Sequence, residues 1–336
     1  MAQWRVRRIG QIIRPGMDGR MGANIQGPSM IRVPEWVPGR LGRYYLYFAD
    51  HKGAYIRLAH ADAPQGPWRM HEAGSLDLEH SLFPTKPPIR SAEPNGKVDV
   101  LPGQAPAGTP GVLPPEVDSA HPHIASPDVH MDEASRRIVM YFHGLVAWGT
   151  QRTRVATSAD GVTFTALPEL LGPSYFRVFR HSGATFALAM PGILLRSADG
   201  LSSFERGPML FEGGLQRHTA VLLRGDTLHV FWTRVGDTPE RIYASRIALR
   251  GDWRGWRVEG EAQDVLRPEM PWEGGDLPLL PSWRGAVHLP VRQLRDPAIF
   301  EEDGRAYLLY AVQGEAGIAI SELSEAEDAW AASPTI

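Results

Sequence analysis

The stretch that decides the fold begins Ala125-Ser126-Pro127-Asp128-Val129-His130 and continues to Arg137-Ile138-Val139-Met140-Tyr141-Phe142-His143. An aspartate stands at the head of a short apolar segment. A few polar residues follow, and then a second run rich in β-branched and aromatic residues. This order is typical of a strand, a turn and a second strand. The same order recurs along the chain, so its repetition predicts the fold.

Five units of this kind can be followed through the sequence. Two of them close with the same Ser-Ala-Asp-Gly turn, at 158–161 and at 197–200. Repeats of about 40 to 50 residues with four strands each are typical of a propeller. A β-sandwich with coincidental spacing is the alternative. Because the order of elements is the same in all five units, we predict an all-β, five-bladed β-propeller of four-stranded antiparallel blades around a central channel.

The predicted organisation is one domain over residues 1–336. The blades are expected at 24–70, 123–168, 173–208, 214–258 and 292–332, with long loops at 70–122 and 259–291. Loops of this length are usually functional or disordered. A further strand is expected over Trp4 to Ile13. Only Ser321 to Ala332 has a helical composition, and we expect it to cap the last blade.

Composition excludes several classes of function. The 336 residues include no cysteine, which rules out disulfides, thiolate chemistry and cysteine-ligated metals. A net charge of -3 gives no reason to expect nucleic acid or an anionic membrane as partner. No segment approaches the roughly 20 apolar residues of a membrane span, and no signal-peptide core is visible. We therefore expect a cytoplasmic protein, and the sequence does not predict an oligomeric state.

In a propeller the first strand of each blade lines the channel, so residues at the heads of these strands meet at one mouth. The first strands are expected to begin near Gln26, Asp128, Tyr175, His218 and Asp296, with Arg177, Arg217 and Arg295 beside them. Any one of these residues alone could be a solvated or capping group. Carboxylates and arginines that converge are costly to assemble, so together they indicate a site.

At these residues the sequence resembles a known group of enzymes. Ser126-Pro127-Asp128-Val129 and Arg295-Asp296-Pro297-Ala298-Ile299-Phe300 are similar to blade motifs of the five-bladed propeller glycoside hydrolases. Family 43 is the best-known member, and families 32, 68, 117 and 130 are relatives. The resemblance covers all five blades in pattern but only blades two and five in specific residues. It implies an enzyme of carbohydrate metabolism that hydrolyses O-glycosyl bonds of short oligosaccharides, with inversion.

The resemblance also implies roles for single residues. Asp296 matches the Arg-Asp-Pro motif of the general base, and Asp128 matches the motif of an orienting aspartate. Family 117 members resemble this chain in using a histidine as proposed acid, which makes His218 a candidate. Inverting geometry would place these three side chains at one mouth, within about 10 Å of one another.

The sequence departs from the family 43 pattern at the other strand heads. The two family aspartates head adjacent blades, whereas here blade one lies between them and offers Gln26. A glutamate acid is expected on the next blade, where this chain has Tyr175 and Arg177. Blade four has Arg217 and His218 where many relatives carry a glutamate. The family roles therefore cannot be transferred as a set.

Other candidates lie on loops. Asp50 and His51 end the second strand of blade one and would line the pocket, the alternative being a plain turn. His123 precedes the Asp128 strand, and with His121 it offers two histidines without further metal ligands. Trp272 and Glu273 suit a sugar platform with a reserve acid, because aromatic faces pack on sugar C–H surfaces. No cofactor or metal is predicted; calcium lies on the axis in some relatives, but nothing in this sequence specifies it.

Two alternatives to a hydrolase remain. A glycoside phosphorylase is one, because phosphorylases resemble this chain in carrying arginine and histidine where a second carboxylate would be. A non-catalytic sugar-binding propeller is the other. The expected partner in every case is a sugar, acted on as an oligosaccharide substrate if the protein is an enzyme.

Overall fold

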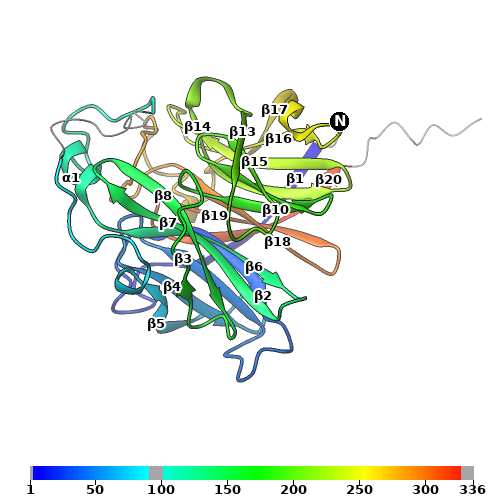
Figure 1. The fold of residues 1–336 in the computed structure, drawn as a ribbon. Helices are drawn as coiled ribbons and strands as arrows, with labels where there is room; N and C mark the ends of the chain where they lie inside the picture. Colours follow the sequence, from blue (N-terminus) through cyan, green and yellow to red (C-terminus); the bar gives the residue numbers. More distant parts are fainter. Residues whose placement is uncertain (1–2, 91–100, 327–336) are drawn as a thin grey trace, which may run out of the picture.

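The structure is a computed structural model and describes residues 3–90 and 101–326. Within these residues the strands form five antiparallel sheets of four strands each, arranged as blades around one axis (Figure 1). The prediction of a five-bladed β-propeller is confirmed. The first strands of neighbouring blades pack against one another and so surround the channel.

The blades follow the order of the chain from the second strand onward. Blade one consists of β2 (Gln26–Arg32), β3 (Tyr44–Ala49), β4 (Tyr55–Ala61) and β5 (Arg69–Asp77). Blade two consists of β6 (Ile124–Asp132), β7 (Arg137–Ala147), β8 (Thr150–Ser158) and β9 (Thr165–Ala166). Blade three consists of β10 (Arg177–His181), β11 (Ala184–Ala189), β12 (Ile193–Ser197) and β13 (Glu205–Met209). Blade four consists of β14 (Gln216–Arg224), β15 (Thr227–Arg234), β16 (Ile242–Ala248) and β17 (Val258–Leu266).

Blade five is built from both ends of the chain. Its inner three strands are β18 (Arg295–Glu302), β19 (Arg305–Ala311) and β20 (Ile318–Ala326), and its outer strand is β1 (Gln3–Ile13). Figure 1 shows β1 beside β20. The strand near the N-terminus was expected, but not its place in blade five. The expected helical cap was wrong over residues 321–326, which belong to β20; residues 327–332 lie outside the described part.

Two loop boundaries also need correction. Residues 70–77 belong to β5, the outer strand of blade one, and residues 259–266 belong to β17, the outer strand of blade four. Both strands carry exposed and charged residues, and the apolar alternation of a half-buried strand is nearly absent from them. Outer strands have only one neighbour, so hydrogen bonding rather than burial decides their conformation.

Contacts between blades fix the ring. Strands such as β3 are buried along their whole length, because their two faces pack against different blades. Tyr47 of blade one donates a hydrogen bond to the Gly161 carbonyl of blade two, and Tyr141 of blade two donates to Gly200 of blade three, each at 2.7 Å. Both glycines lie in the repeated Ser-Ala-Asp-Gly turn and have positive φ. The repeated motif therefore joins successive blades.

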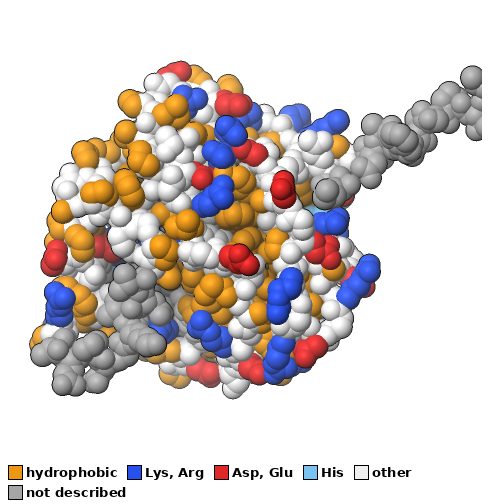
Figure 2. Space-filling view, turned by 90° about the horizontal axis from the view of Figure 1, so that it is seen from above, with side chains coloured by type: hydrophobic (Ala, Val, Ile, Leu, Met, Phe, Trp, Pro, Cys, Tyr) orange, Lys and Arg blue, Asp and Glu red, His pale blue; other side chains and the backbone are white. Residues whose placement is uncertain are grey.

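Little of the described chain is helical. It holds one short α-helix, α1 (Pro115–Ala120), and the 3-10 turns η1 (Leu78–His80), η2 (Glu212–Gly214), η3 (Trp253–Gly255) and η4 (Pro271–Glu273). Among the described residues no helix is long and apolar enough to cross a membrane. On the face shown in Figure 2, basic and acidic side chains are interspersed with apolar ones, and neither sign of charge gathers into one field.

Candidate active site

A ring of bulged residues lies where the first strands begin, at what we call the head end of the channel. Gly27, Ser126, Tyr175, His218 and Asp296 have φ between 42° and 67°. In blades one, two, four and five the pairing of the first two strands shifts at this point, as in a β-bulge. Backbone of this kind costs about 1–3 kcal/mol at a residue other than glycine and gathers at functional sites. Bulges also re-aim a side chain.

The ring shows which residues occupy equivalent positions. In blades one, two and five a proline follows the bulged residue, as in Gly27-Pro28, Ser126-Pro127 and Asp296-Pro297. The counterpart of Asp296 in blade two is therefore Ser126, and Asp128 lies two residues further along its strand. The bulges of blades one and two approach each other closely. A Cβ on Gly27 would come within 2.9 Å of the Ser126 Cα, so this close approach requires a residue without a side chain.

Asp296 is the carboxyl group of this ring. It is 1% exposed, Tyr175 donates a hydrogen bond to its Oδ1 at 2.7 Å, and its buried Oδ2 has no hydrogen-bond partner among the described residues. Burial raises the pKa of Asp296 to about 6, the nearby Glu315 adds to the rise, and Tyr175 and Arg217 oppose it. A carboxyl group with this pKa and a free oxygen is suited to take up a proton near neutral pH.

His218 lies beside Asp296, with 3.5 Å between its Nε2 and Asp296 Oδ1. Arg217 directs its Nε and Nη2 to the same ring nitrogen at 3.2 and 3.1 Å. Burial, followed by the charges of Arg217 and Arg295, holds the pKa of His218 well below its ordinary value. The imidazole is therefore neutral at physiological pH and does not carry the proton that an acid would donate.

Two buried glutamates neutralise the arginines of the head end. Glu240 pairs with Arg295 at 3.2 Å and with Arg217 at 3.7 Å. Glu315 accepts hydrogen bonds from Arg295 Nη1 at 2.8 Å and from Asn24 Nδ2 at 2.8 Å. Both glutamates are buried. The two arginines thus have carboxylate partners already.

His51, one of the loop candidates, completes the surroundings of Glu315, with 3.2 Å between its Nδ1 and Glu315 Oε1. Burial alone would raise the pKa of Glu315, but His51 and Arg295 outweigh it and hold this pKa well below the usual range. Glu315 is thus an anion, and its charge helps to raise the pKa of Asp296.

An arc of rings continues from His218 across the channel. Ring centroids lie 5.1 Å apart for His218 and Tyr175, 6.2 Å for Tyr175 and His143, and 6.1 Å for His143 and His123. Burial lowers the pKa of His143 to about 3 and holds that of His123 well below its usual value. The buried nitrogens without a hydrogen-bond partner among the described residues include His123 Nε2, His143 Nδ1 and Gln26 Nε2. Such atoms are costly unless a ligand or water meets them.

Two long loops lie over the head end. Arg217 donates to the carbonyls of Trp283 and Gly285, and Arg295 Nη1 donates to that of Gly285. The backbone nitrogen of Arg284 in turn donates to the Gly103 carbonyl at 2.8 Å. Segments 101–123 and 267–294 therefore pack on one another and on the arginines of the site.

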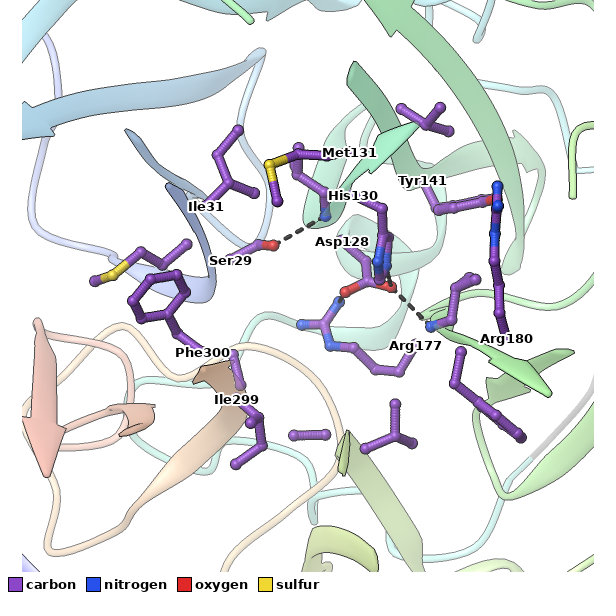
Figure 3. Close-up of a pocket in the computed structure, with 18 of the residues that line it drawn as sticks. Ser29, Ile31, Asp128, His130, Met131, Tyr141, Arg177, Arg180, Ile299 and Phe300 are labelled. Atoms are coloured by element: carbon purple, nitrogen blue, oxygen red, sulfur yellow. Dashed lines mark hydrogen bonds and ion pairs between the residues drawn. The ribbon is translucent and has the colours of Figure 1, made fainter. Parts of the chain in front are cut away.

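Asp128 does not join this group. Its Oδ2 accepts hydrogen bonds from His130 Nε2 and from the backbone nitrogen of Val178, each at 2.8 Å, and its Oδ1 lies 4.0 Å from Arg177 Nη1. Burial would raise the pKa of Asp128, but His130 and Arg177 outweigh it and lower this pKa. Among the described residues no hydrogen bond or ion pair links Asp128 to His218 or Asp296. It lines a cavity of about 410 Å³ in which neither of them takes part (Figure 3).

Three of the loop candidates make contacts that stabilise the fold. Glu273 is buried and accepts hydrogen bonds from Arg8, Tyr310 and two backbone nitrogens, which occupy both of its oxygens. Trp272 packs against the core between blades four and five. Asp50 accepts from the backbone nitrogen of Lys52 at 2.8 Å, as the plain-turn interpretation expects.

Sequence reasoning missed Glu240, Glu315 and the contribution of His143. Glu240 follows β15 and Glu315 follows β19, in the loops between the second and third strands of their blades. Those loops reach the same end of the channel as the heads of the first strands, so acidic residues in them were the signal available. The described residues contain no group of three or more His, Cys, Asp or Glu that could hold a metal ion.

The fold is similar to that of several solved structures. A thermostable family-43 glycoside hydrolase superposes with a TM-score of 0.55 at 11% identity, over 94% of this chain and 93% of the other. A family-43 β-xylosidase/α-arabinofuranosidase from a compost microbial metagenome, in complex with xylotriose and in a calcium-free form, gives a TM-score of 0.53 at 12% identity over 98% of both chains. The chain is thus a five-bladed β-propeller of the kind seen in the family-43 glycoside hydrolases.

Sequence comparison gives a more specific result. No model of a known protein family matches the chain. The "Uncharacterized protein R118" of Acanthamoeba polyphaga mimivirus is 34% identical over 324 residues, which is 89% of this chain and 83% of the viral protein. The chain belongs to the same family as this mimivirus protein.

Proposed function

We propose that the protein is a glycoside hydrolase that cleaves short oligosaccharides at the head end of the channel, with Asp296 as general base. The observation that carries the proposal is the state of Asp296, a buried carboxyl group with a pKa of about 6 and an unpartnered oxygen at a bulged strand head. At pH 7 such a group is mostly ionised, yet basic enough to take a proton from water. The resemblance to family 43 favours the same role.

Three neighbours support this role. Tyr175 fixes Oδ1 of Asp296, which leaves Oδ2 free to contact water. The unpartnered nitrogens of Gln26 and His143 are available for sugar hydroxyls. A base that activates water, rather than attacking the sugar itself, leads to inversion at the anomeric carbon.

Hydrolysis is favoured over phosphorolysis by the charges at the head end. A phosphate needs free guanidinium groups, but Arg217 and Arg295 already contact Glu240 and Glu315. Water, which is neutral, needs no such groups. Because burial and the charges of Arg217 and Arg295 keep the pKa of His218 well below its ordinary value, His218 is proposed to position Asp296 and not to act as the acid.

The experiment is a panel of aryl glycosides and oligosaccharides, with and without inorganic phosphate, followed by product stereochemistry. Xylotriose is the first oligosaccharide to test, because it is bound in one of the structures that share the fold. We expect turnover that does not depend on phosphate and that Asp296→Asn lowers about 10²–10⁴-fold. Asp303→Asn is the matched control, since Asp303 lies on an exposed turn of the same blade.

Three results would contradict the proposal. Turnover that requires phosphate would indicate a phosphorylase. Binding of oligosaccharides without turnover would indicate a sugar-binding propeller. Near wild-type turnover by Asp296→Asn would remove Asp296 from the reaction.

A further inference from the structure

The cavity lined by Asp128 lies towards the opposite end of the channel from Asp296. In β14, His218 is the third residue and Leu223 is the eighth, and Leu223 lines the cavity. Five residues of extended strand span about 16 Å. The outer lining residues Met131 and Arg180 are exposed, so the cavity opens to solvent. We call it the turn-end cavity, after the turns between first and second strands that surround it.

The floor of this cavity offers a donor and an acceptor side by side. Arg177 is 2% exposed, and its Nη2 is buried without a partner among the described residues. Among the described residues Asp128 Oδ1 accepts no hydrogen bond, and Arg177 Nη1 lies 4.0 Å from it. Figure 3 shows the Arg177 guanidinium beside the Asp128 carboxylate, with one edge towards the middle of the cavity. A buried guanidinium nitrogen without a partner is costly, which points to a ligand or water at this place.

Arg177 is held rigidly in this position. Its Nε donates to the Thr219 carbonyl and its Nη1 to the Pro127 carbonyl, each at 3.1 Å. The Tyr175 ring covers it on the side of the head end, with the guanidinium carbon 4.5 Å from the ring centroid. Only the remaining edge is free to meet something in the cavity, so the donor is pre-organised.

The walls of the turn-end cavity are apolar and the rim is charged. The walls are formed by Met30, Ile31, Val129, Val221, Leu223 and Phe300. On the rim, Arg137 pairs with Asp132 at 2.9 Å and Glu301 pairs with Arg224, while Arg180 is exposed. Opposite charges therefore face each other at the floor and at much of the rim.

We propose that the turn-end cavity binds a neutral monosaccharide, at a site separate from Asp296. A hydroxyl group both donates and accepts, which matches Arg177 Nη2 and Asp128 Oδ1 together. An anion would meet the charge of Asp128, and a cation would meet that of Arg177. The C–H faces of a sugar ring pack on apolar and aromatic walls. A volume of about 410 Å³ lies within the range of small-molecule sites, roughly 300–1,000 Å³.

The test measures binding and not turnover, so it does not depend on the function proposed for Asp296. D-glucose, D-galactose, D-xylose and L-arabinose are added to the full chain, and binding is followed by saturation-transfer NMR and calorimetry. Val221→Trp fills the cavity without touching its floor. Asp128→Asn keeps the shape of the floor and removes its charge. Val117→Trp is the matched control, because Val117 is 46% exposed on α1.

We expect at least one sugar to bind, and both Val221→Trp and Asp128→Asn to weaken it about tenfold or more. Val117→Trp and Asp296→Asn should leave this affinity unchanged, the latter because Asp296 is outside the cavity. Thermal unfolding of each variant shows whether it is folded, and either cavity variant suffices if the other does not fold. The proposal is overturned if no sugar binds, if Val221→Trp binds as the wild type does, if Asp296→Asn abolishes binding, or if inorganic phosphate displaces the sugar.

Discussion

Replacing Asp296 by asparagine should change how the stability of the protein depends on pH. The pKa of Asp296 rises from 3.8, its ordinary value, to about 6 in the folded chain. The unfolded chain therefore loses this proton at lower pH than the folded chain does, and folding becomes less favourable as pH rises. The difference between the two pKa values corresponds to about 3 kcal/mol of lost stability above pH 6, absent below about pH 4. About 2 kcal/mol of it appears between pH 4.5 and 7.5.

The assay is urea unfolding at a series of pH values, followed by tryptophan fluorescence. Asparagine cannot ionise, so the free energy of unfolding of Asp296→Asn should gain about 2 kcal/mol on the wild type between pH 4.5 and 7.5. The prediction concerns how the difference in free energy of unfolding between variant and wild type changes with pH. Any effect of the new amide that does not depend on pH therefore cancels.

Asp128→Asn is the matched control for this measurement. His130 and Arg177 lower the pKa of Asp128, so this carboxylate adds stability at neutral pH that is lost on acidification. Between pH 4.5 and 7.5 Asp128 is ionised in the folded and in the unfolded chain, so the free energy of unfolding of Asp128→Asn should stay at a constant difference from the wild type, and the variant should gain on the wild type only on acidification below about pH 4. A change below about 0.5 kcal/mol for Asp296→Asn between pH 4.5 and 7.5, the usual limit of additivity, or an equally large gain for Asp128→Asn over the same range, would refute the reasoning.

Three further predictions concern neighbouring residues. Tyr175→Phe removes a hydrogen bond that lowers the pKa of Asp296, so the acid limb of the kcat/KM profile should move above its wild-type position near pH 6; an unmoved limb would contradict the role of Tyr175. His218 is neutral throughout, so His218→Gln should keep the basic limb of the profile, and loss of that limb would restore the histidine as acid. Glu273→Gln should lower the free energy of unfolding by about 1–3 kcal/mol, because Arg8 and Tyr310 lose a charged partner; urea unfolding that matches the wild type would show that these contacts contribute nothing.

The blades could be predicted because their inner strands are buried on both faces. Runs such as Tyr44–Ala49 and Arg305–Ala311 are almost wholly apolar, and they recur with similar turns between them. The outer strands carry no such signal. The pairing of β1 with β20 depends on segments about 315 residues apart, as in Arg7 opposite Glu322, and no local pattern encodes it.

The site was predicted in part for a related reason. Asp296 and His218 could be found because strand heads converge in any propeller. Asp128 was grouped with them because its motif looks alike, but an extra residue in a bulge changes which side chain is equivalent. The prolines that follow Gly27, Ser126 and Asp296 mark the true correspondence. Glu240 and Glu315 could not be assigned from strand patterns, because they lie in loops and act only by their distance from arginines.

The position of β1 has a consequence for how the protein is made. β1 is synthesised before every other described strand, yet its partner β20 ends at Ala326, so β1 must wait through the synthesis of the other strands. During that time its unpaired edge could pair with other chains, the usual hazard of an exposed strand. Arg5, Arg7 and Arg8 place three positive charges in this strand, and charge on an edge opposes such pairing. We therefore expect these arginines to disfavour pairing of β1 with other chains until β20 has been made.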